Sequence, residues 1–340
     1  FNLSSVGGLT IDAAAGTDQV TVLGNVSGNT IGVVRGANTN VTVDALQSAD
    51  IVTASTEHLL ISAGLGDDTT KVSVTGGPEL TIDGGGNSIS DRLNIANTTA
   101  GVSSVTPGST PDSGSVSTPD TANDTAFVGI EFISLTGAAA TDDLFILGTL
   151  DADTFTLEAD AATVNDRAEV NFSSFDNVAL LGLDGDDTIT VDPTSLSVGT
   201  LITAAGQNGQ DSVEVVGSSG TDAIGFNPTS STDATVTIAG AVTTNITSSE
   251  SVTIDGDEGN DTVTVNTPAG VISTSLTPGS TIDSGDVQVA SLIPVSFDNL
   301  GATGSLVIDD ADAVADDTLI YQGTGSDDDF DLSAAAVVSL

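Results

Sequence analysis

The sequence predicts an all-β protein, a parallel β-solenoid built from short strand–acidic turn–strand repeats. Short runs rich in Val, Ile and Thr alternate apolar and polar residues, as half-buried strands do. One strand–turn–strand unit recurs along the chain, and units that cannot bury an apolar face alone do so by stacking. No stretch places apolar residues at helical spacing between helix caps.

The clearest copy of the unit is VTIDGDEGNDTVTV at residues 252–265. Its two strands flank an acidic turn in which Gly256 and Gly259 permit tight backbone geometry. Asp68 and Asp91 lie 23 positions apart (91 − 68), which predicts a solenoid coil of about that length. Longer gaps between copies predict coils that carry insertions. The other copies occupy residues 9–22, 61–74, 80–95, 133–147, 178–191, 201–215 and 306–321.

The sequence also contains a repeat of longer period, which spans several of these units. The segment at 97–116 matches 266–287, and FTLEADAATV (155–164) corresponds to FDLSAAAVVSL (330–340). The same long repeat also permits two tandem β-sandwich modules, which is the alternative fold. Our predicted division is module 1 at 1–154, module 2 at 155–329, and a C-terminal strand at 330–340 that repeats the module start and can link subunits.

Prolines mark one segment of the repeat. Residues 101–124 contain Pro107, Pro111 and Pro119 among Ser, Thr and Gly, which is the composition of a loop. Because 269–286 repeats the same turn residues, we expect an ordered excursion from the solenoid at both places.

The charge balance excludes several classes of partner. Four Lys and Arg stand against 48 Asp and Glu, for a formal net charge of −44. Nucleic acid is excluded, because phosphate binding needs clustered basic residues. The chain has no Cys and no apolar run long enough to span a membrane, so we expect no disulfide and no membrane insertion. This composition favours an extracellular or cell-surface protein of a bacterium or archaeon, and salt adaptation would explain the acidity equally well.

Three turns have a recognisable acidic pattern, GDDTI at 185–189, GNDTV at 259–263 and GDDTT at 66–70. They resemble half of the glycine–aspartate nonapeptide of RTX (hemolysin-type) calcium-binding repeats, and the chain as a whole resembles acidic, repetitive bacterial or archaeal surface solenoids. The tandem nine-residue spacing of the RTX family is absent.

The resemblance implies calcium at these turns. Ca²⁺ takes six to eight oxygen ligands, and an acidic turn supplies part of such a shell. The alternative is that Asp serves these turns by capping its own backbone. We assign no catalytic residue and no organic cofactor. The expected Ca²⁺ ligands are Asp67, Asp68, Asp184, Asp186, Asp187, Asp257 and Asp261.

The remaining candidates for chemistry are few. His58 is the single histidine, and without Cys or a second His it offers no transition-metal site. No G-x-S-x-G elbow with a placed histidine occurs, so triad hydrolysis is not expected. The three arginines, Arg35, Arg92 and Arg167, are expected to be ion-pair partners.

The sequence leaves three functions open. The first is a structural, non-enzymatic extracellular subunit that assembles with itself, head to tail, into a fibre or surface layer. The second is a cell-surface adhesin or calcium-binding stalk, and the third is a carbohydrate-active β-helix enzyme. The first is favoured because 330–340 repeats a module start, so we expect this strand to complete the next subunit by β-strand donation.

Overall fold

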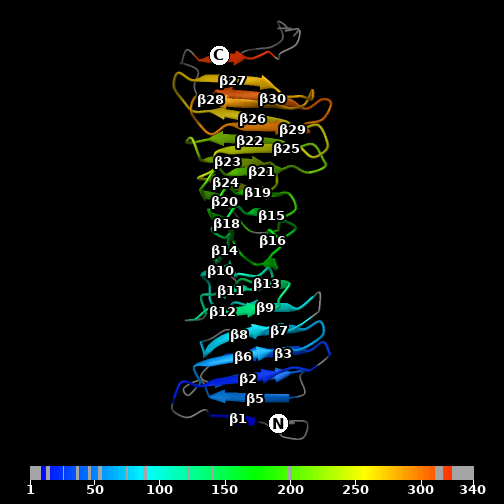
Figure 1. Ribbon diagram of the computed structural model, residues 1–340. Coiled ribbons are helices and arrows are strands. Elements are labelled where there is room, and N and C mark those ends of the chain that lie inside the picture. The colour runs from blue at the N-terminus through cyan, green and yellow to red at the C-terminus, as the bar shows by residue number, and fades with distance from the viewer. Residues whose placement is uncertain are drawn as a thin grey trace. The chain divides into compact units, whose positions relative to one another are not determined.

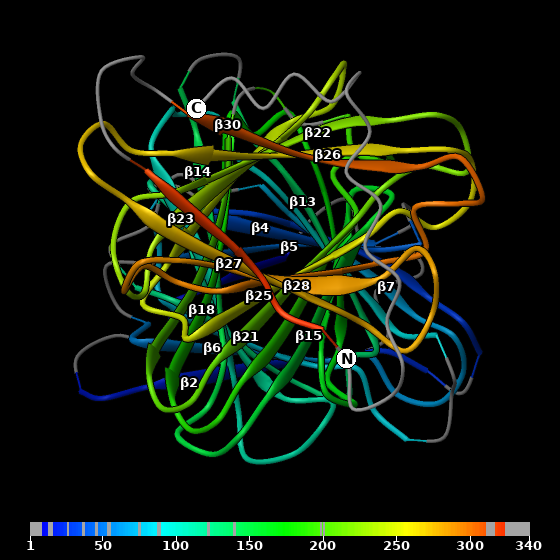
Figure 2. The same cartoon turned by 90° about the horizontal axis from the view of Figure 1, so that it is seen from above.

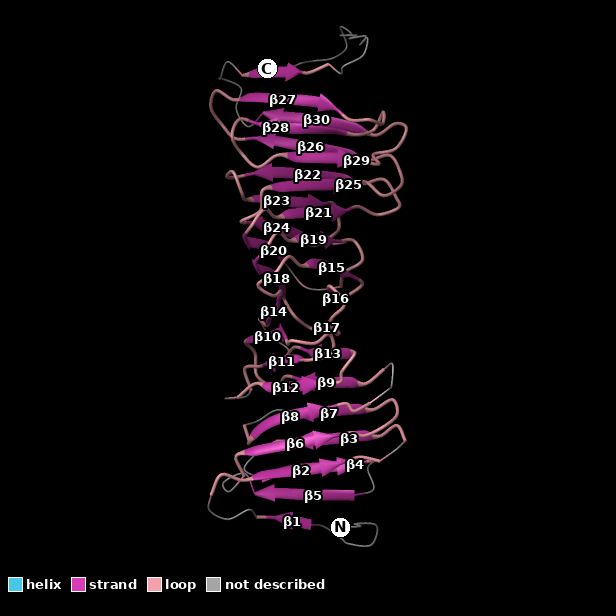
Figure 3. Cartoon of the chain, in the orientation of Figure 1, coloured by secondary structure: helices cyan, strands magenta, loops and turns pink. Residues whose placement is uncertain are grey.

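The computed structural model describes residues 9–12, 16–25, 27–35, 38–44, 47–52, 56–73, 76–86, 90–120, 123–138, 141–197, 199, 201–310 and 317–323. These residues form strands joined by turns, with no helix among them (Figure 3), which confirms the predicted all-β class. Within this described part, no helix is long and apolar enough to cross a membrane. The expected donor strand at 330–340 lies outside the described residues.

Contacts divide the chain into two compact units. Unit 1 comprises 1–148 and 160–179, and unit 2 comprises 149–159 and 180–340. Strand β18 (Asn177–Asp184) has residues in both units. The predicted module boundary after residue 154 falls at the start of strand β15 (Thr154–Glu158), which belongs to unit 2.

Unit 1 contains two sheets whose strands stack one above another (Figure 1). In stacking order, the first sheet contains β1 (Leu9–Ile11), β5 (Gln47–Val52), β4 (Asn38–Val43), β3 (Thr30–Val34), β7 (Thr69–Ser73), β9 (Arg92–Ala96), β13 (Phe132–Thr136), β17 (Glu169–Ser173) and β16 (Ala161–Val164). The second sheet contains β2 (Gln19–Leu23), β6 (His58–Ser62), β8 (Glu79–Asp83), β12 (Thr125–Val128), β11 (Gly114–Ser117), β10 (Val102–Pro107) and β14 (Asp143–Leu147).

Unit 2 is built in the same way. Its first sheet contains β15, β19 (Thr188–Val191), β21 (Ser212–Val216), β25 (Ser251–Asp255), β29 (Val295–Asp298), β28 (Gly285–Val289), β27 (Ser273–Pro278) and β31 (Thr318–Tyr321). Its second sheet contains β18, β20 (Leu201–Asn208), β24 (Thr243–Thr247), β23 (Ala234–Ile238), β22 (Ala223–Pro228), β26 (Thr262–Thr267) and β30 (Ser305–Asp310).

Parallel stacking of like coils forms the core. Strands β6 and β8 pair in parallel, with Leu59 beside Leu80 and Ile61 beside Ile82, and all four side chains are fully buried. Alternate residues of these strands point outward, because successive side chains of a strand lie on opposite faces. Figure 2 shows the same strands from above, where neighbouring strands within a unit are turned slightly relative to one another by the usual sheet twist. The predicted parallel β-solenoid is thus confirmed.

Antiparallel meanders interrupt the parallel stack in both units. In unit 1 the chain enters β3, reverses through β4 into β5, and only then resumes parallel pairing, with β5 on β1 and β7 on β3. The chain therefore runs backward along the stack for two strands. The meanders β10–β11–β12, β22–β23–β24 and β27–β28–β29 do the same. These meanders are the insertions that lengthen some coils.

The prediction of a loop at 101–124 is wrong in part, since residues 102–107 and 114–117 form β10 and β11. Proline did not prevent this, because Pro107 is the last residue of β10 and a strand end can spare the amide that proline lacks. The expectation of an ordered excursion, repeated at β27–β28, is confirmed.

Candidate functional site: buried carboxylate rows

Polar side chains form a row along one edge of each unit, at the end of the turn that leads into a strand in each successive coil. Each member immediately precedes a strand of the first sheet of its unit, so parallel stacking brings the members side by side. We call these the carboxylate rows. Row 1 contains Asn29, Asp68, Asp91 and Glu131, and row 2 contains Asp153, Asp187, Asp211 and Glu250.

Hydrogen bonds run along row 2 from coil to coil. The amide N–H of Asp153 donates to Oδ1 of Asp187 at 2.8 Å, and the amide of Asp187 donates to Oδ1 of Asp211 at 2.8 Å. The amide of Asp211 donates to Oε2 of Glu250 at 2.7 Å. Each carboxylate therefore satisfies a backbone donor that would otherwise be left unpaired at the strand entrance.

Row 1 repeats this pattern. Oδ1 of Asp68 accepts the amide of Asn29, and Oδ1 of Asp91 accepts the amide of Asp68 at 2.6 Å. The amide of Asp91 donates to Oε2 of Glu131 at 2.8 Å. The spacings of 23 residues between Asp68 and Asp91 and 24 between Asp187 and Asp211 are thus contacts between adjacent coils, as the sequence predicted.

The same contact recurs at the strand entrances of the second sheets. In unit 1 the amide of Gly101 donates to Oδ1 of Asp142 at 2.6 Å, and in unit 2 the amide of Asp222 donates to Oδ1 of Asp261 at 2.8 Å. The bond from a backbone amide to the aspartate of the following coil is therefore a general feature of this solenoid.

The second oxygen of several of these carboxylates is buried without a hydrogen-bond partner. Asp187 is 1% exposed, and its Oδ2 contacts no donor in the described part of the chain. A buried carboxylate oxygen with no donor disfavours the charged form of the group. The other aspartates with this arrangement are Asp68, Asp142, Asp211, Asp261 and Asp317.

A glycine five residues before the aspartate makes room for the inward carboxylate. A Cβ added to Gly182 would lie 2.0 Å from Oδ2 of Asp187 and 2.5 Å from the carbonyl oxygen of Gly206. A Cβ on Gly256 would lie 2.5 Å from Oδ2 of Asp261. No real side-chain carbon tolerates such contacts, so the turn needs glycine for close approach rather than for its backbone conformation.

Burial controls the protonation of these groups. It raises the pKa of Asp187 to about 6, opposed by the hydrogen bond from the Asp153 amide and assisted by the charges of Asp211, Asp153 and Asp186. Burial likewise raises the pKa of Asp68, Asp211 and Asp261 above the ordinary value, with neighbouring carboxylates adding to the effect.

The seven residues expected to bind calcium fall into two groups. Asp68, Asp187 and Asp261 point inward and bind backbone amides of the neighbouring coil. The remaining four, Asp67, Asp184, Asp186 and Asp257, are exposed at the turns. The structure therefore separates the acidic residues of one turn between the interior and the surface.

The exposed pair in the β18–β19 turn faces the next coil. Oδ1 of Asp184 accepts Nδ2 of Asn208 at 2.9 Å, and Oδ1 of Asp186 accepts the amide of Gln210 at 2.9 Å. Across the described ranges, no group of three or more His, Cys, Asp or Glu side chains has metal-binding geometry. A surface ion at this turn would take two carboxylates and draw its remaining oxygens from backbone or water.

What the rows do chemically follows from these contacts. They bind backbone amides, fix the register of adjacent coils, and bury carboxyl groups whose pKa is raised at Asp68, Asp187, Asp211 and Asp261. The sequence analysis did not single out Asp142, Asp153, Glu131 or Glu250 as site residues. The signal that finds most of the aspartates is a glycine five positions before an Asp that opens a strand, as in Gly137 and Asp142.

Comparison of the chain with protein-family models, with curated proteins and with solved structures found no match.

Proposed function

We propose that the protein is a structural, non-enzymatic subunit of an extracellular fibre or surface layer, joined head to tail through β-strand contacts. The observation that carries this proposal is the apolar surface of the last described strand of unit 2. In β31, Leu319 is 47% exposed, Ile320 45% and Tyr321 50%. Exposed apolar strands invite pairing with another chain.

The construction of the solenoid supports the same proposal. Its coils are held by contacts to like coils above and below, and a heterologous contact of this kind repeats from subunit to subunit. A second copy that continues the stack would bury β31 by the same interactions that bury β6 against β8. Calcium at the exposed turn acids, which lowers the repulsion among 48 carboxylates, is part of the proposal.

Electron microscopy and sedimentation of the purified protein test the assembly. We expect concentration-dependent filaments or sheets, and we expect Leu319→Lys to abolish them by burying a charge at each joint. Leu150→Lys is the matched control, because Leu150 is 72% exposed in a turn away from β31. Both variants should keep the wild-type melting temperature. A monodisperse wild-type protein at high concentration, with or without Ca²⁺, would contradict the proposal.

A further inference from the structure

Two meanders of this protein, one in each unit, have the same local structure. Pro107 and Pro278 end their first strands, 171 positions apart (278 − 107). The register is the same in both, with Pro107 opposite Gly114 and Pro278 opposite Gly285.

The turns that follow these prolines also match. In unit 1 the amide of Gly108 donates to the carbonyl of Ser113 at 2.7 Å, and in unit 2 the amide of Gly279 donates to the carbonyl of Ser284 at 2.9 Å. In each turn the serine hydroxyl donates to the threonine carbonyl, Thr110 at 3.1 Å and Thr281 at 3.2 Å. The two turns thus present their carbonyl oxygens in the same arrangement.

In unit 1 an arginine binds this turn. Nη1 of Arg167 donates to the carbonyl oxygens of Gly108 at 2.6 Å and Thr110 at 3.0 Å. The next residue adds a backbone bond, from the Ala168 amide to the carbonyl of Pro111 at 2.9 Å. This binding of carbonyls differs from the ion pair expected from the sequence.

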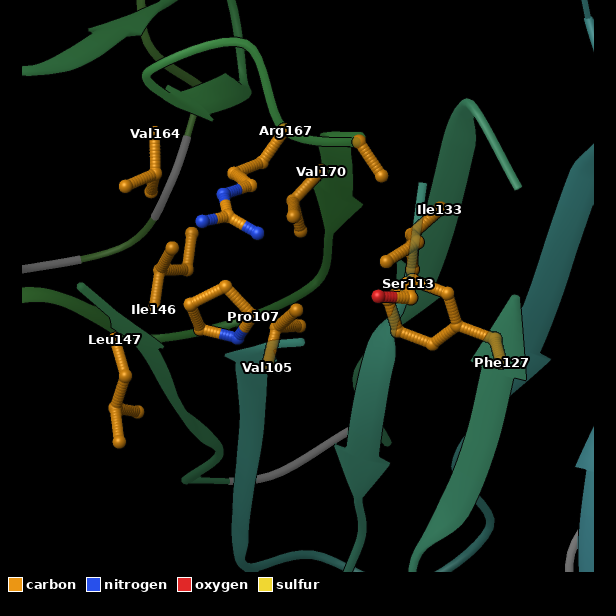
Figure 4. A pocket seen from close by; sticks show the side chains of 11 residues that line it. Val105, Pro107, Ser113, Phe127, Ile133, Ile146, Leu147, Val164, Arg167 and Val170 are labelled. Carbon is orange, nitrogen blue, oxygen red and sulfur yellow. The ribbon is translucent and has the colours of Figure 1, made fainter. Parts of the chain in front are cut away.

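The hairpin formed by β16 and β17 also covers the apolar side chains beside the turn. Figure 4 shows Arg167 among Val164, Ile146, Pro107 and Val170. A cavity of about 20 Å³ remains there, about the space of one water molecule.

The corresponding place in unit 2 is open. It is a cavity of about 440 Å³ lined by Leu276, Pro278, Ile282, Phe297, Leu306 and Tyr321, among others. In β14 of unit 1, Ile146 pairs with Val105 and is 1% exposed, whereas its counterpart Tyr321 pairs with Leu276 and is 50% exposed. No described residue of unit 2 occupies the place that Arg167 fills in unit 1.

We propose that this cavity is the docking site for a β-hairpin of a second polypeptide. The hairpin carries an arginine among small apolar residues, like the β16–β17 hairpin of unit 1 with Val164, Arg167, Ala168 and Val170. The guanidinium binds the carbonyls of Gly279 and Thr281. A backbone amide of the hairpin binds the carbonyl of Ile282, the counterpart of Pro111. The apolar residues cover Leu276, Phe297 and Tyr321.

Charge and exposure at the cavity fit this occupant. Asp283 lines the cavity and no basic side chain does, so an arginine enters a favourable field on a protein of net charge −44. Ile282 and Tyr321 both line the cavity and are 100% and 50% exposed, so an occupant would remove apolar surface of both side chains from water. The inference goes beyond the proposed assembly, because the arginine hairpin of another copy is already packed on its own unit 1.

A peptide with the sequence of residues 160–175 of this chain is the probe, labelled at its N-terminus and titrated with the full-length protein by fluorescence anisotropy. We expect saturable binding, weakened at least tenfold when the arginine of the peptide is replaced by alanine, and weakened less by lysine, which keeps the charge but loses the planar donor fork.

Variants of the protein locate the site. Ile282→Asp and Tyr321→Ala should each weaken binding at least fivefold, and their exposed positions leave the fold intact. Val271→Asp is the control, since Val271 is 74% exposed and lies outside the cavity lining, and it should bind like the wild type. Absence of binding would overturn the inference, and this is the result expected if residues 324–340 of the same chain fill the cavity. Equal binding of the alanine peptide, or unchanged binding to both cavity variants, would overturn it too.

The titration is repeated on the Leu319→Lys variant, so that self-assembly does not compete with the peptide. Peptide binding without wild-type filaments rejects the proposed function and leaves this inference standing. Filaments without peptide binding reject this inference alone.

Discussion

The amide of Asp187 donates a 2.8 Å hydrogen bond to the carboxylate of Asp211, which lies 24 residues later in the chain and one coil further along unit 2. Asp187 in turn accepts the amide of Asp153, so one residue links three coils. Because its other carboxylate oxygen is buried without a partner, the same residue is also the place where pH acts on the fold.

The first prediction is that the protein becomes less stable as the pH rises from 4 to 7. The pKa of Asp187 is about 6 in the folded protein, against about 3.9 in an unfolded chain, so the folded state binds more protons between these values. Its stabilising contribution is complete below pH 4 and is lost as the pH rises through 6, an effect of up to about 3 kcal/mol. Urea unfolding at each pH measures it.

Asp187→Asn tests the assignment. Asparagine keeps an oxygen that can accept the Asp153 amide and removes the charge. We expect the variant to have a flatter stability profile between pH 4 and 6. Asp186→Asn removes a charge at the exposed neighbour and should leave the steep profile largely in place. Equal profiles for the wild type and Asp187→Asn would mean that the buried carboxyl does not titrate in this range.

The sequence predicted the stacked coils because alternation and spacing are set by the contacts that hold them. Thr69 and Arg92 are paired in the structure because Asp68 and Asp91 lie one coil apart. The backward path of the meanders was not predictable in this way. Apolar alternation marks a strand and its buried face, but it is the same for a parallel and an antiparallel neighbour.

The division of the turn acids was not predicted either. Asp186 and Asp187 are adjacent and chemically identical, yet one is exposed and the other buried. Composition cannot distinguish the buried aspartate from the exposed one. Two features of position distinguish them: Asp187 immediately precedes a strand, and the glycine five residues earlier leaves space for its carboxylate.

The second prediction concerns that glycine. Gly182→Ala places a methyl group against Oδ2 of Asp187 and the carbonyl of Gly206, so the turn must shift. We expect a loss of stability of about 1–3 kcal/mol, the usual effect of overpacking, with a lower melting temperature. Gly220→Ala is the matched control, since the nearest atom to its added carbon is the Ser218 hydroxyl at 3.5 Å. Equal melting temperatures for the two variants would show that the corner is not tightly packed.

The third prediction concerns the contact between Arg92 and Phe132, which face each other across β9 and β13. The guanidinium carbon of Arg92 lies 4.4 Å from the centroid of the ring. A double-mutant cycle with Arg92→Gln and Phe132→Leu should give a coupling of about 0.5–1 kcal/mol, the range of partly exposed cation–π pairs. If the effects of the two substitutions are additive, the Phe132 ring contributes only by packing and has no energetic coupling to Arg92.

The last prediction concerns calcium. We expect Ca²⁺ at the turns to use the exposed carboxylates, because Asp187 and Asp261 point inward and each holds a backbone amide through one oxygen. We therefore expect added Ca²⁺ to raise the melting temperature at fixed ionic strength, and EDTA to reverse the rise. The double substitution Asp184→Asn and Asp186→Asn should remove part of that shift, whereas Asp187→Asn should retain it.

The control for this experiment is the pair Asp124→Asn and Asp166→Asn, which removes the same two charges at exposed positions outside the turn. A general screening of the −44 charge would respond equally to both double variants and to NaCl alone. A specific site would respond only to the loss of Asp184 and Asp186. Loss of the calcium shift in Asp187→Asn alone would instead require the buried carboxylate to leave its amide and turn outward, contrary to the arrangement of the carboxylate rows.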